Sequence, residues 1–388
     1  MAALYRRLAL VVSVALLLLV AVACGGDGGE APATTADDAS ATTVGGAEET
    51  TVATDEPADT TAPADTSEEP TGELTQVTFA PTAPLPIYWP YYYIADPLGF
   101  YEDEGIDIEF ANVQTAVQQS LLAGRLTFSG TGLDYIPQAP TLDDPPKWFM
   151  NVDRYLWVMV TLADSEFQTA ADLRGGNIGI NAPHDSLDAN FLMGAAGVPQ
   201  GEYELIPVGE DLPAMVQLEE GAIDAFVTAG AVSVAAIRDF SDTEIRIIEN
   251  EAAESFYNVG SMLTLDQLEN DRDLAVRFGR AVARGMVWTW ENPEATGRLV
   301  FEMFPESAED EEQAIRLIEA GNEANRASYD ARGAMELEVY QQMVDQHADQ
   351  ELIDESYDAS ILFTNDLIED IWDFDLEAEA EAARNYEG

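Results

Sequence analysis

Short apolar strands and helical segments take turns along most of this chain, and no other feature of the sequence constrains the fold more. Strands are expected at residues 77–80, 107–110, 126–128, 177–180, 204–208 and 223–227, and in a buried apolar run at 155–162. Residues 115–123, 186–196 and 212–219 instead space their apolar side chains as helices do. Such alternation is typical of βαβ units and of parallel sheet.

The last third of the chain has a different character, because it is mainly helical. Helices are expected at residues 274–290, 293–304, 311–325 and 334–346. About 315 residues follow Glu73, which is enough chain for two lobes or one large domain. The sequence therefore predicts an α/β protein of two lobes followed by a helical layer.

The only cysteine of the chain, Cys24, lies where the composition changes abruptly. Two arginines and an apolar run precede it, and the small residues Ala21 and Ala23 lead up to it, so residues 1–23 read as a secretion signal. The apolar run is about 16 residues, shorter than the roughly 20 that span a membrane as a helix. The ending resembles a bacterial lipobox, in which the cysteine is acylated, although Ala21 stands where Leu is commoner. The alternative is an ordinary cleaved signal with an incidental cysteine.

Residues 24–73 form the second part of the chain, and their composition predicts a disordered tether. After Cys24 they consist of Gly, Ala, Thr, Asp, Glu, Ser and Pro, with two valines and no aromatic residue. Such a segment cannot bury enough apolar surface to fold. As a flexible coil it would span on the order of 40 Å and hold a folded body away from a surface.

The chain is strongly acidic, with 73 acidic and 17 basic residues and a net charge of −56. This charge argues against nucleic acid and anionic membrane surfaces as partners of the folded part. The net negative charge also repels anionic ligands at long range, although hydrogen-bond donors clustered at a binding site can outweigh this repulsion. Two interpretations stay open. The acidity is an adaptation that keeps the protein soluble in a salty habitat, or it reflects the chemistry of the ligand.

Several motifs occur in an order that resembles one family. The segment from Tyr93 to Glu109, YIADPLGFYEDEGIDIE, is followed by LLAGRLT from Leu121, DLRGGNIGI from Asp172, LEEGAIDA from Leu218 and ENPE from Glu291. Together these resemble the solute-binding proteins of ABC importers, in the branch that binds nitrate, taurine, alkanesulfonates and thiamine pyrimidine precursors. One departure is Thr127, which replaces the usual acid. The resemblance runs from about residue 77 to residue 372.

The resemblance implies an architecture as well as a role. It implies the type II periplasmic-binding-protein-like fold, with two α/β lobes, two crossover strands and a helical C-terminal layer. Lobe 1 would comprise residues 74–160 and 256–388, and lobe 2 residues 161–255. The crossovers are expected near residues 158–163 and 256–263. Ligand would favour the closed state of the two lobes through contacts that the open state lacks.

An aromatic cluster at residues 88–93 follows a strand end, where the cleft of an open sheet is expected. The rings of Trp89, Tyr91 and Tyr92 are candidates for stacking on a flat ligand or facing a cation. Alternatively they pack a helix onto the sheet, which is our interpretation of Tyr93. In the pyrimidine-precursor members a His stands at the position of Trp89. This chain lacks that His, which is the key residue of the pyrimidine-synthase reaction, so the resemblance does not imply an enzyme.

Polar residues near the ends of other predicted segments of lobe 1 are further candidates for ligand contact. Ser129, Thr131 and Asp134 follow the predicted strand at 126–128, in what we expect to be a turn. Asp134 is alternatively a cap of the next helix. Tyr257 and Asn258 lie at the second expected crossover and would complete the rim of the cleft.

Lobe 2 contributes a second set of candidates. His184, Asp185 and Ser186 stand at the expected N-terminus of a helix, whose free N–H groups can bind an anionic or carbonyl oxygen. Asp185 and Ser186 are alternatively plain N-cap residues. Thr228 follows the strand at 223–227 and would also reach the rim.

The sequence does not favour an enzyme. It contains no Gly-x-Ser-x-Gly motif, no pair of histidines at metal spacing and no cysteine after Cys24, so no metal and no cofactor are expected. The leading hypothesis is a monomeric, lipid-anchored receptor on the extracytoplasmic face of a bacterial membrane. It would pass a small solute, such as a pyrimidine precursor or another flat aromatic compound, to an ABC permease and its ATPase. Alternatives are a receptor for sulfonate- or nitrate-type anions and a sensory relative that binds a partner protein.

Overall fold

The computed structural model describes residues 73–387 apart from 82–85, 114–116, 155–156, 182–184, 249, 251–252 and 254–255. These residues belong to one compact unit, Thr66–Gly388. The predicted signal at 1–23, Cys24 and the tether up to residue 72 lie outside the described residues, as does His184. None of the helices in the described part has the length and apolar character needed to span a membrane.

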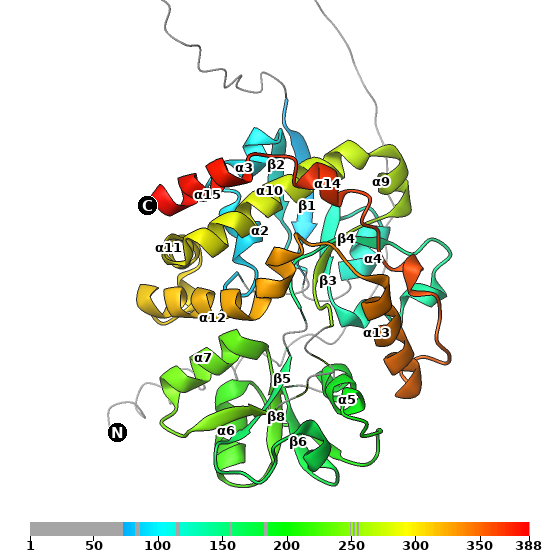
Figure 1. Cartoon of the computed structure of the whole chain (residues 1–388), viewed down its shortest axis with the longest axis vertical. Coiled ribbons are helices and arrows are strands. Elements are labelled where there is room, and N and C mark those ends of the chain that lie inside the picture. The colour runs from blue at the N-terminus through cyan, green and yellow to red at the C-terminus, as the bar shows by residue number, and fades with distance from the viewer. Residues whose placement is uncertain are drawn as a thin grey trace, which may run out of the picture. The chain divides into compact units, whose positions relative to one another are not determined.

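Two five-stranded sheets organise the fold (Figure 1). The first has the order β2-β1-β3-β10-β4 and the second the order β7-β6-β8-β5-β9. The strands are β1 Thr75–Ala80, β2 Ile106–Phe110, β3 Phe128–Thr131, β4 Lys147–Asn151, β5 Val158–Leu162, β6 Asn177–Ile180, β7 Glu204–Pro207, β8 Ala225–Thr228, β9 Ile245–Ile248 and β10 Gly260–Leu263. The two-lobed α/β fold predicted from the sequence is therefore confirmed.

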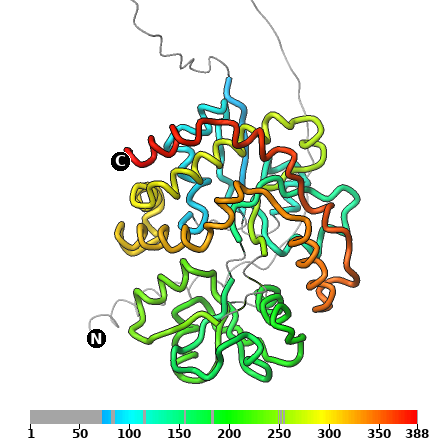
Figure 2. The backbone as a smooth tube through the Cα atoms, in the orientation of Figure 1, coloured from blue at the N-terminus to red at the C-terminus, as the bar shows by residue number. Residues whose placement is uncertain are grey.

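Helices cover both sheets and form the C-terminal layer (Figure 2). They are α2 Pro90–Ile94, α3 Phe100–Asp103, α4 Val117–Leu122, α5 Ser186–Ala195, α6 Asp211–Glu219, α7 Gly230–Phe240, α9 Leu265–Asn270, α10 Arg272–Glu291, α11 Pro293–Met303, α12 Glu311–Asp330, α13 Leu337–Asp349, α14 Ile368–Ile371 and α15 Leu376–Asn385. The predicted helices at 274–290, 293–304, 311–325 and 334–346 correspond to α10 to α13, with boundaries that differ by up to five residues.

The strand directions bring the carboxyl edges of the two sheets toward the same region. In the first sheet, β10 runs antiparallel to both β3 and β4, and Gly260 pairs with Thr131 and with Asn151 at their carboxyl ends. In the second sheet, β5 runs antiparallel to β8, and its first residue, Val158, pairs with Thr228, the last residue of β8. Both chain connections therefore leave one carboxyl edge and enter the other.

The connections themselves lie a few residues away from their predicted positions. Residues 158–162 form β5 of the second sheet and residues 260–263 form β10 of the first, so these strands belong to the sheets. The first connection follows β4, and its described residues are 152–154 and 157; the second follows β9, and its described residues are 250, 253 and 256–259. An isolated antiparallel bridge between Arg154 and Tyr257 joins the two connections. The apolar composition of 158–162 fits a buried strand better than a connection, because β5 lies between β8 and β9.

The core of the first sheet is largely aromatic. Phe278 of α10 packs against Phe79 of β1 and Phe128 of β3, with ring centroids 5.2 and 4.7 Å apart. Tyr92 of α2 packs on Phe79 at 4.6 Å. All four side chains are completely or almost completely buried. Because an aromatic side chain removes 150–250 Å² from water, this cluster is a major source of stability for the first lobe.

Two helices of the C-terminal layer also contact the second lobe. Arg316 and Gln313 of α12 donate hydrogen bonds to Asp239 at the end of α7, at 3.1 and 2.9 Å. Gln346 of α13 donates to the carbonyl of Phe191 in α5 at 2.5 Å. The C-terminal layer therefore contacts the second lobe at two helices, α7 and α5.

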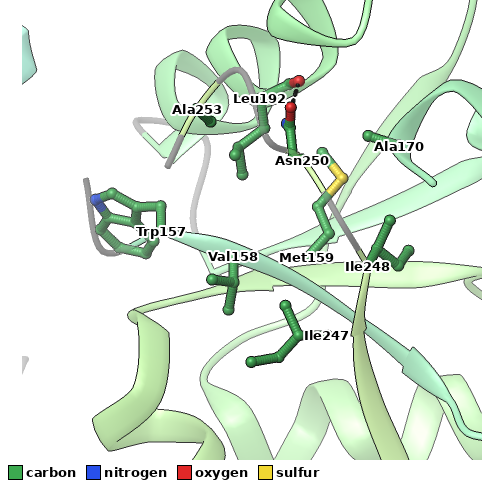
Figure 3. A pocket seen from close by; sticks show the side chains of 9 residues that line it. All are labelled: Trp157, Val158, Met159, Ala170, Leu192, Ile247, Ile248, Asn250 and Ala253. Carbon is green, nitrogen blue, oxygen red and sulfur yellow. Dashed lines mark hydrogen bonds between the residues drawn. The ribbon is translucent and has the colours of Figure 1, made fainter. Parts of the chain in front are cut away.

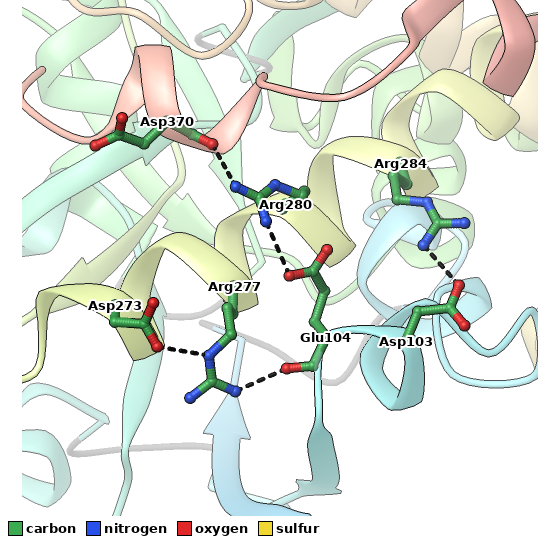
Figure 4. A network of polar contacts seen from close by, with 7 residues as sticks. All are labelled: Asp103, Glu104, Asp273, Arg277, Arg280, Arg284 and Asp370. Carbon is green, nitrogen blue, oxygen red and sulfur yellow. Dashed lines mark hydrogen bonds and ion pairs between the residues drawn. The ribbon is translucent and has the colours of Figure 1, made fainter. Parts of the chain in front are cut away.

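A row of arginines on α10 fastens this helix to α3 and to the C-terminal segment (Figure 4). Arg277 donates to the backbone carbonyl of Glu104 at 2.7 Å, and Arg280 bonds the Glu104 carboxylate at 3.1 Å. Arg284 pairs with Asp103 at 2.8 Å and with Glu379 of α15 at 2.8 Å. Partly buried ion pairs of this kind contribute more to the stability of the fold than exposed pairs, which typically contribute only about 0–1 kcal/mol.

A prediction follows from the close approach of α10 to α2. A methyl group on Gly285 would meet the carbonyl oxygen of Tyr91, so we expect Gly285→Ala to force the helices apart and to lower the free energy of unfolding by about 1–3 kcal/mol. Gly321→Ala in α12 is the matched control, because the new methyl would meet only Val232 at 3.4 Å. It should raise stability by about 0.5–1 kcal/mol through helix propensity. Chemical denaturation checks both values, and equal effects would contradict the packing argument.

Candidate ligand-binding site

The region between the facing carboxyl edges is where residues of both lobes meet. Tyr88 precedes α2 on the first lobe, and its hydroxyl lies 2.7 Å from the hydroxyl of Ser233 on α7. Tyr88 is half-buried. Burial raises the pKa of Tyr88 to about 12, the Ser233 hydrogen bond lowers it in part, and the charges of Asp211 and Glu210 raise it further. The phenol is therefore neutral at ordinary pH and links the two lobes directly.

The carboxyl edge of the second sheet presents three helix N-termini. Helices α5, α6 and α7 each begin just after the strands β6, β7 and β8, so their first residues open on the region between the lobes. Thr228, at the end of β8, donates to the carboxylate of Asp211 at the start of α6 at 2.6 Å. Thr228 itself is buried. Its position at the strand end agrees with the prediction, but its hydroxyl is engaged by Asp211.

Carboxylates of the two lobes also approach each other. Asp134 follows β3 in the first lobe and accepts a hydrogen bond from Gln118 at 2.9 Å, while much of its side chain stays exposed. Desolvation raises its pKa. Burial and the charges of Asp185 and Asp134 raise the pKa of Asp188 in α5 well above its usual range. An acidic group of the first lobe therefore lies close enough to α5 to affect the pKa of Asp188.

Other predicted residues of the second lobe lie at the start of α5. Asp185 occupies the N-cap position but makes no capping hydrogen bond with its side chain, and Ser186 is the first residue of the helix. Both side chains are half-buried. Their placement agrees with the expected helix N-terminus, and the capping interpretation of Asp185 is not supported by its geometry.

The aromatic cluster is buried. Trp89 and Tyr91 are 6% and 5% exposed, and Tyr92 is completely buried with its hydroxyl 2.9 Å from that of Ser261. Tyr93 stacks on Phe110 at 4.7 Å, as expected of a packing residue. Of the two roles that the sequence left open for Trp89, Tyr91 and Tyr92, packing is the one that their burial favours. Among the described residues the Tyr91 hydroxyl has no hydrogen-bond partner.

Ser129 and Thr131 are placed differently from the prediction. They do not form a turn after a strand, because both lie inside β3, which pairs with β1 and β10. Their side chains are completely buried, and neither hydroxyl has a partner in the described part of the chain. The turn prediction failed because Gly130 interrupts the apolar pattern, although glycine is tolerated in a strand between close neighbours.

The second connection brings its residues close to the end of β3. A Cβ atom at Gly132 would lie 3.5 Å from Oδ1 of Asn258 and 3.8 Å from Oδ1 of Asp134. Asn258 is half-buried, whereas Tyr257 is almost completely buried and carries the Arg154 guanidinium over its ring at 4.5 Å. Asn258 and Asp134 are therefore the predicted pair that the fold brings together on the first lobe.

Sequence reasoning missed Asp153, which lies at the start of the first connection. Its side chain is completely buried and accepts hydrogen bonds from Trp89 Nε1 at 2.9 Å and from the backbone N–H of Val259 at 2.5 Å. Burial raises its pKa to about 7, against the lowering effect of hydrogen bonds from Trp89, Val259 and Asn258. No local pattern marks this residue, since its partners are distant in the sequence.

Two small cavities flank the connections. One of 50 Å³ lies in the second lobe between Trp157, Val158, Leu192 and Ile248, and Asn250 closes one side by donating to the Leu192 carbonyl at 2.9 Å (Figure 3). The other, of 20 Å³, lies in the first lobe beside Tyr88, Tyr91 and Asn325. The smaller cavity is large enough for one water molecule, and Tyr91 is among the residues that line it. No group of three or more metal-ligating side chains occurs among the described residues.

Comparisons with known proteins agree with this architecture. A family model described as NMT1/THI5 like matches residues 88–296. No curated protein sequence matches the chain. Among solved structures, the chain is similar to the periplasmic sulfonate-binding protein SsuA of a sulfonate ABC transporter from Methylobacillus flagellatus KT, with 15% identity, 77% and 94% of the two chains covered and a TM-score of 0.57.

Two further structures show the same fold at low identity. One is the ligand-binding component of an ABC-type import system from Staphylococcus aureus with zinc bound, at 10% identity, with 77% and 98% covered and a TM-score of 0.54. The other is a mutant of DSZB in complex with biphenyl-2-sulfinic acid, at 14% identity, with 76% and 98% covered and a TM-score of 0.51. At such low identity, both similarities are evidence of a shared fold alone.

A prediction follows from the hydrogen bond between Tyr88 and Ser233. We expect Tyr88→Phe and Ser233→Ala each to lower the free energy of unfolding, with a coupling of about 0.5–1.5 kcal/mol, because either change removes the same bond between the lobes. Denaturation of the wild type, the two single variants and the double variant measures the coupling. Additive effects would show that this contact does not link the lobes.

Proposed function

This chain belongs to the NMT1/THI5-like family, and on that premise we propose that it is an extracytoplasmic solute-binding protein that delivers a small molecule to an ABC importer. The observation that carries the proposal is that two chain connections join the carboxyl edge of the first sheet to the carboxyl edge of the second. A ligand between them would contact both lobes at once, and such contacts favour the closed arrangement.

The solute that this region fits best is a small neutral or cationic compound with hydrogen-bond donors, for which a pyrimidine precursor or another flat aromatic amine is our candidate. Asp134, Asp185 and Asp211 surround the region with carboxylates, and these accept hydrogen bonds but repel anions. Tyr88 and Trp157 are partly exposed near the connections, and they are our candidates for contact with a flat ring. A sulfonate or nitrate ligand is the alternative, supported by the helix N-termini.

We favour binding over catalysis for this chain. Its only cysteine is Cys24, so the folded part offers no thiol nucleophile, and the described residues hold no cluster that suits a metal ion. The half-buried and exposed polar groups between the lobes are carboxylates, an amide and hydroxyls, which suffice to orient a ligand.

We also propose that the protein is a monomer anchored through acylated Cys24. A diacylglycerol group on this residue and the 49-residue acidic segment after it would keep the folded part near its permease. The composition of residues 1–73 supports this proposal.

Ligand binding by the secreted chain is the first test. Residues 24–388 carrying Cys24→Ser should show a melting temperature that rises with concentration for one class among aminopyrimidines, flat aromatic amines, sulfonates and nitrate, because a ligand that binds only the folded state stabilises it. Thermal-shift measurements check this. If none of the four classes raises the melting temperature, the proposed solute class is wrong.

The charge of the ligand is tested by Asp134→Asn. Loss of a carboxylate that bonds a donor should weaken the binding of an amine about tenfold or more, whereas it should strengthen the binding of an anion. Asp144→Asn is the matched control, since Asp144 precedes the amino end of β4, at the opposite edge of the sheet. Calorimetric affinities of the wild type and both variants decide between the two ligand classes, and equal affinities in all three would exclude Asp134 from the site.

The anchor is tested in cells. We expect a radioactive fatty acid to label the full chain and the Cys24→Ser variant to lose both the label and membrane association. Gel fluorography and membrane fractionation measure these outcomes. A Cys24→Ser chain that keeps its label would overturn the proposed site of acylation.

A further inference from the structure

Asp153 lies at the point where the first connection leaves the first sheet, two residues after β4 ends at Asn151. Its side chain has no exposed surface. A fully buried carboxylate is costly unless hydrogen bonds compensate it, so the partners of Asp153 decide whether its ionised form is stable here.

The hydrogen bonds of this carboxylate tie together three segments that are distant in the sequence. One oxygen accepts from Trp89 Nε1 at 2.9 Å, and the other accepts from the backbone N–H of Val259 at 2.5 Å. Backbone bonds continue the junction, because Val152 donates to the Val259 carbonyl at 3.0 Å and Asn258 donates to the Asp153 carbonyl at 3.3 Å. Both connections and the loop before α2 therefore meet at Asp153.

The groups that face Asp153 are mostly neutral. Burial raises the pKa values of Tyr91 and Tyr92 on α2 and of Tyr340 on α13, and the nearby charge of Asp153 adds to this effect. Arg154, the next residue, directs its guanidinium over the Tyr257 ring. Only hydrogen bonds from Trp89, Val259 and Asn258 oppose the effect of burial on Asp153, and its pKa rises to about 7.

We propose that Asp153 is a positioning residue whose carboxylate fixes both connections and Trp89 in one arrangement, so that proton uptake by Asp153 shifts the equilibrium between open and closed lobes. This inference rests on the proposed function, since it assumes that the lobes open and close around a solute. A carboxylate accepts on both oxygens, whereas the protonated acid keeps one oxygen as a donor and gives up charge-assisted hydrogen bonds. The junction is therefore tightest when Asp153 is ionised.

Ionisation of Asp153 has the opposite effect on the stability of the whole fold. Because the folded-state pKa of Asp153 is raised above the usual value of 3.8, its contribution to stability is present below about pH 4 and is lost as the pH rises through about 7. Ionisation thus tightens the junction while it costs overall stability. A merely structural role would produce the second effect without a change in the arrangement of the lobes.

The test measures lobe separation directly and needs no ligand. Fluorophores are attached to Glu109→Cys in β2 and Glu220→Cys after α6, both exposed, in residues 24–388 with Cys24→Ser. The energy-transfer distance should change with pH, with a midpoint near 7, and should lose this dependence in Asp153→Asn. Asp144→Asn should keep the wild-type profile. An Asp153→Asn chain that responds to pH as the wild type does would overturn the proposal.

A second variant covers the case in which Asp153→Asn does not fold. Trp89→Phe removes one donor that favours the ionised carboxylate, so the midpoint should move to higher pH. An unchanged midpoint would also overturn the proposal. Because neither readout involves a solute, a failure of the ligand screen leaves this result interpretable. Once a solute is known, its affinity should change with pH by no more than about tenfold per unit, as one coupled proton requires.

Discussion

The antiparallel entry of β10 into the first sheet and of β5 into the second is the constraint on which the arrangement of the lobes depends. Each strand lies inside its sheet with two partners, so the chain must cross between the sheets at their carboxyl edges. Helices α5, α6 and α7 begin on the same side. A site in this region takes groups from both sheets, as open α/β sheets generally allow.

The distribution of charge gives this region its chemical character. Arg277, Arg280 and Arg284 are used on the outer face of the first lobe to hold α3 and the C-terminal segment. Near the connections, burial and the charges of Asp185 and Asp134 raise the pKa of Asp188. Part of the negative charge of the chain is therefore concentrated near the connections.

The sequence predicted the two-lobed fold, most strands and the long C-terminal helices, because these depend on local periodicity. It placed Asp134, Asp185 and Ser186 correctly beyond strand ends for the same reason. It did not find β4, β9 or Asp153, whose environment depends on contacts between distant segments, and it anticipated β10 only as a crossover strand near residues 256–263. Trp89 and Tyr91 stood in the expected region, but their burial follows from the packing of α2 against α10, which spacing alone does not reveal.

The position of β10 between β3 and β4 also sets an order of folding. The second sheet uses only strands between Val158 and Ile248, which are continuous in the sequence, whereas the first sheet needs a strand made after all of them. A chain that emerges from its N-terminus can complete the second lobe first. Until β10 arrives, the facing edges of β3 and β4 present unpaired backbone groups, and this interval is when the chain is most exposed to pairing with other strands.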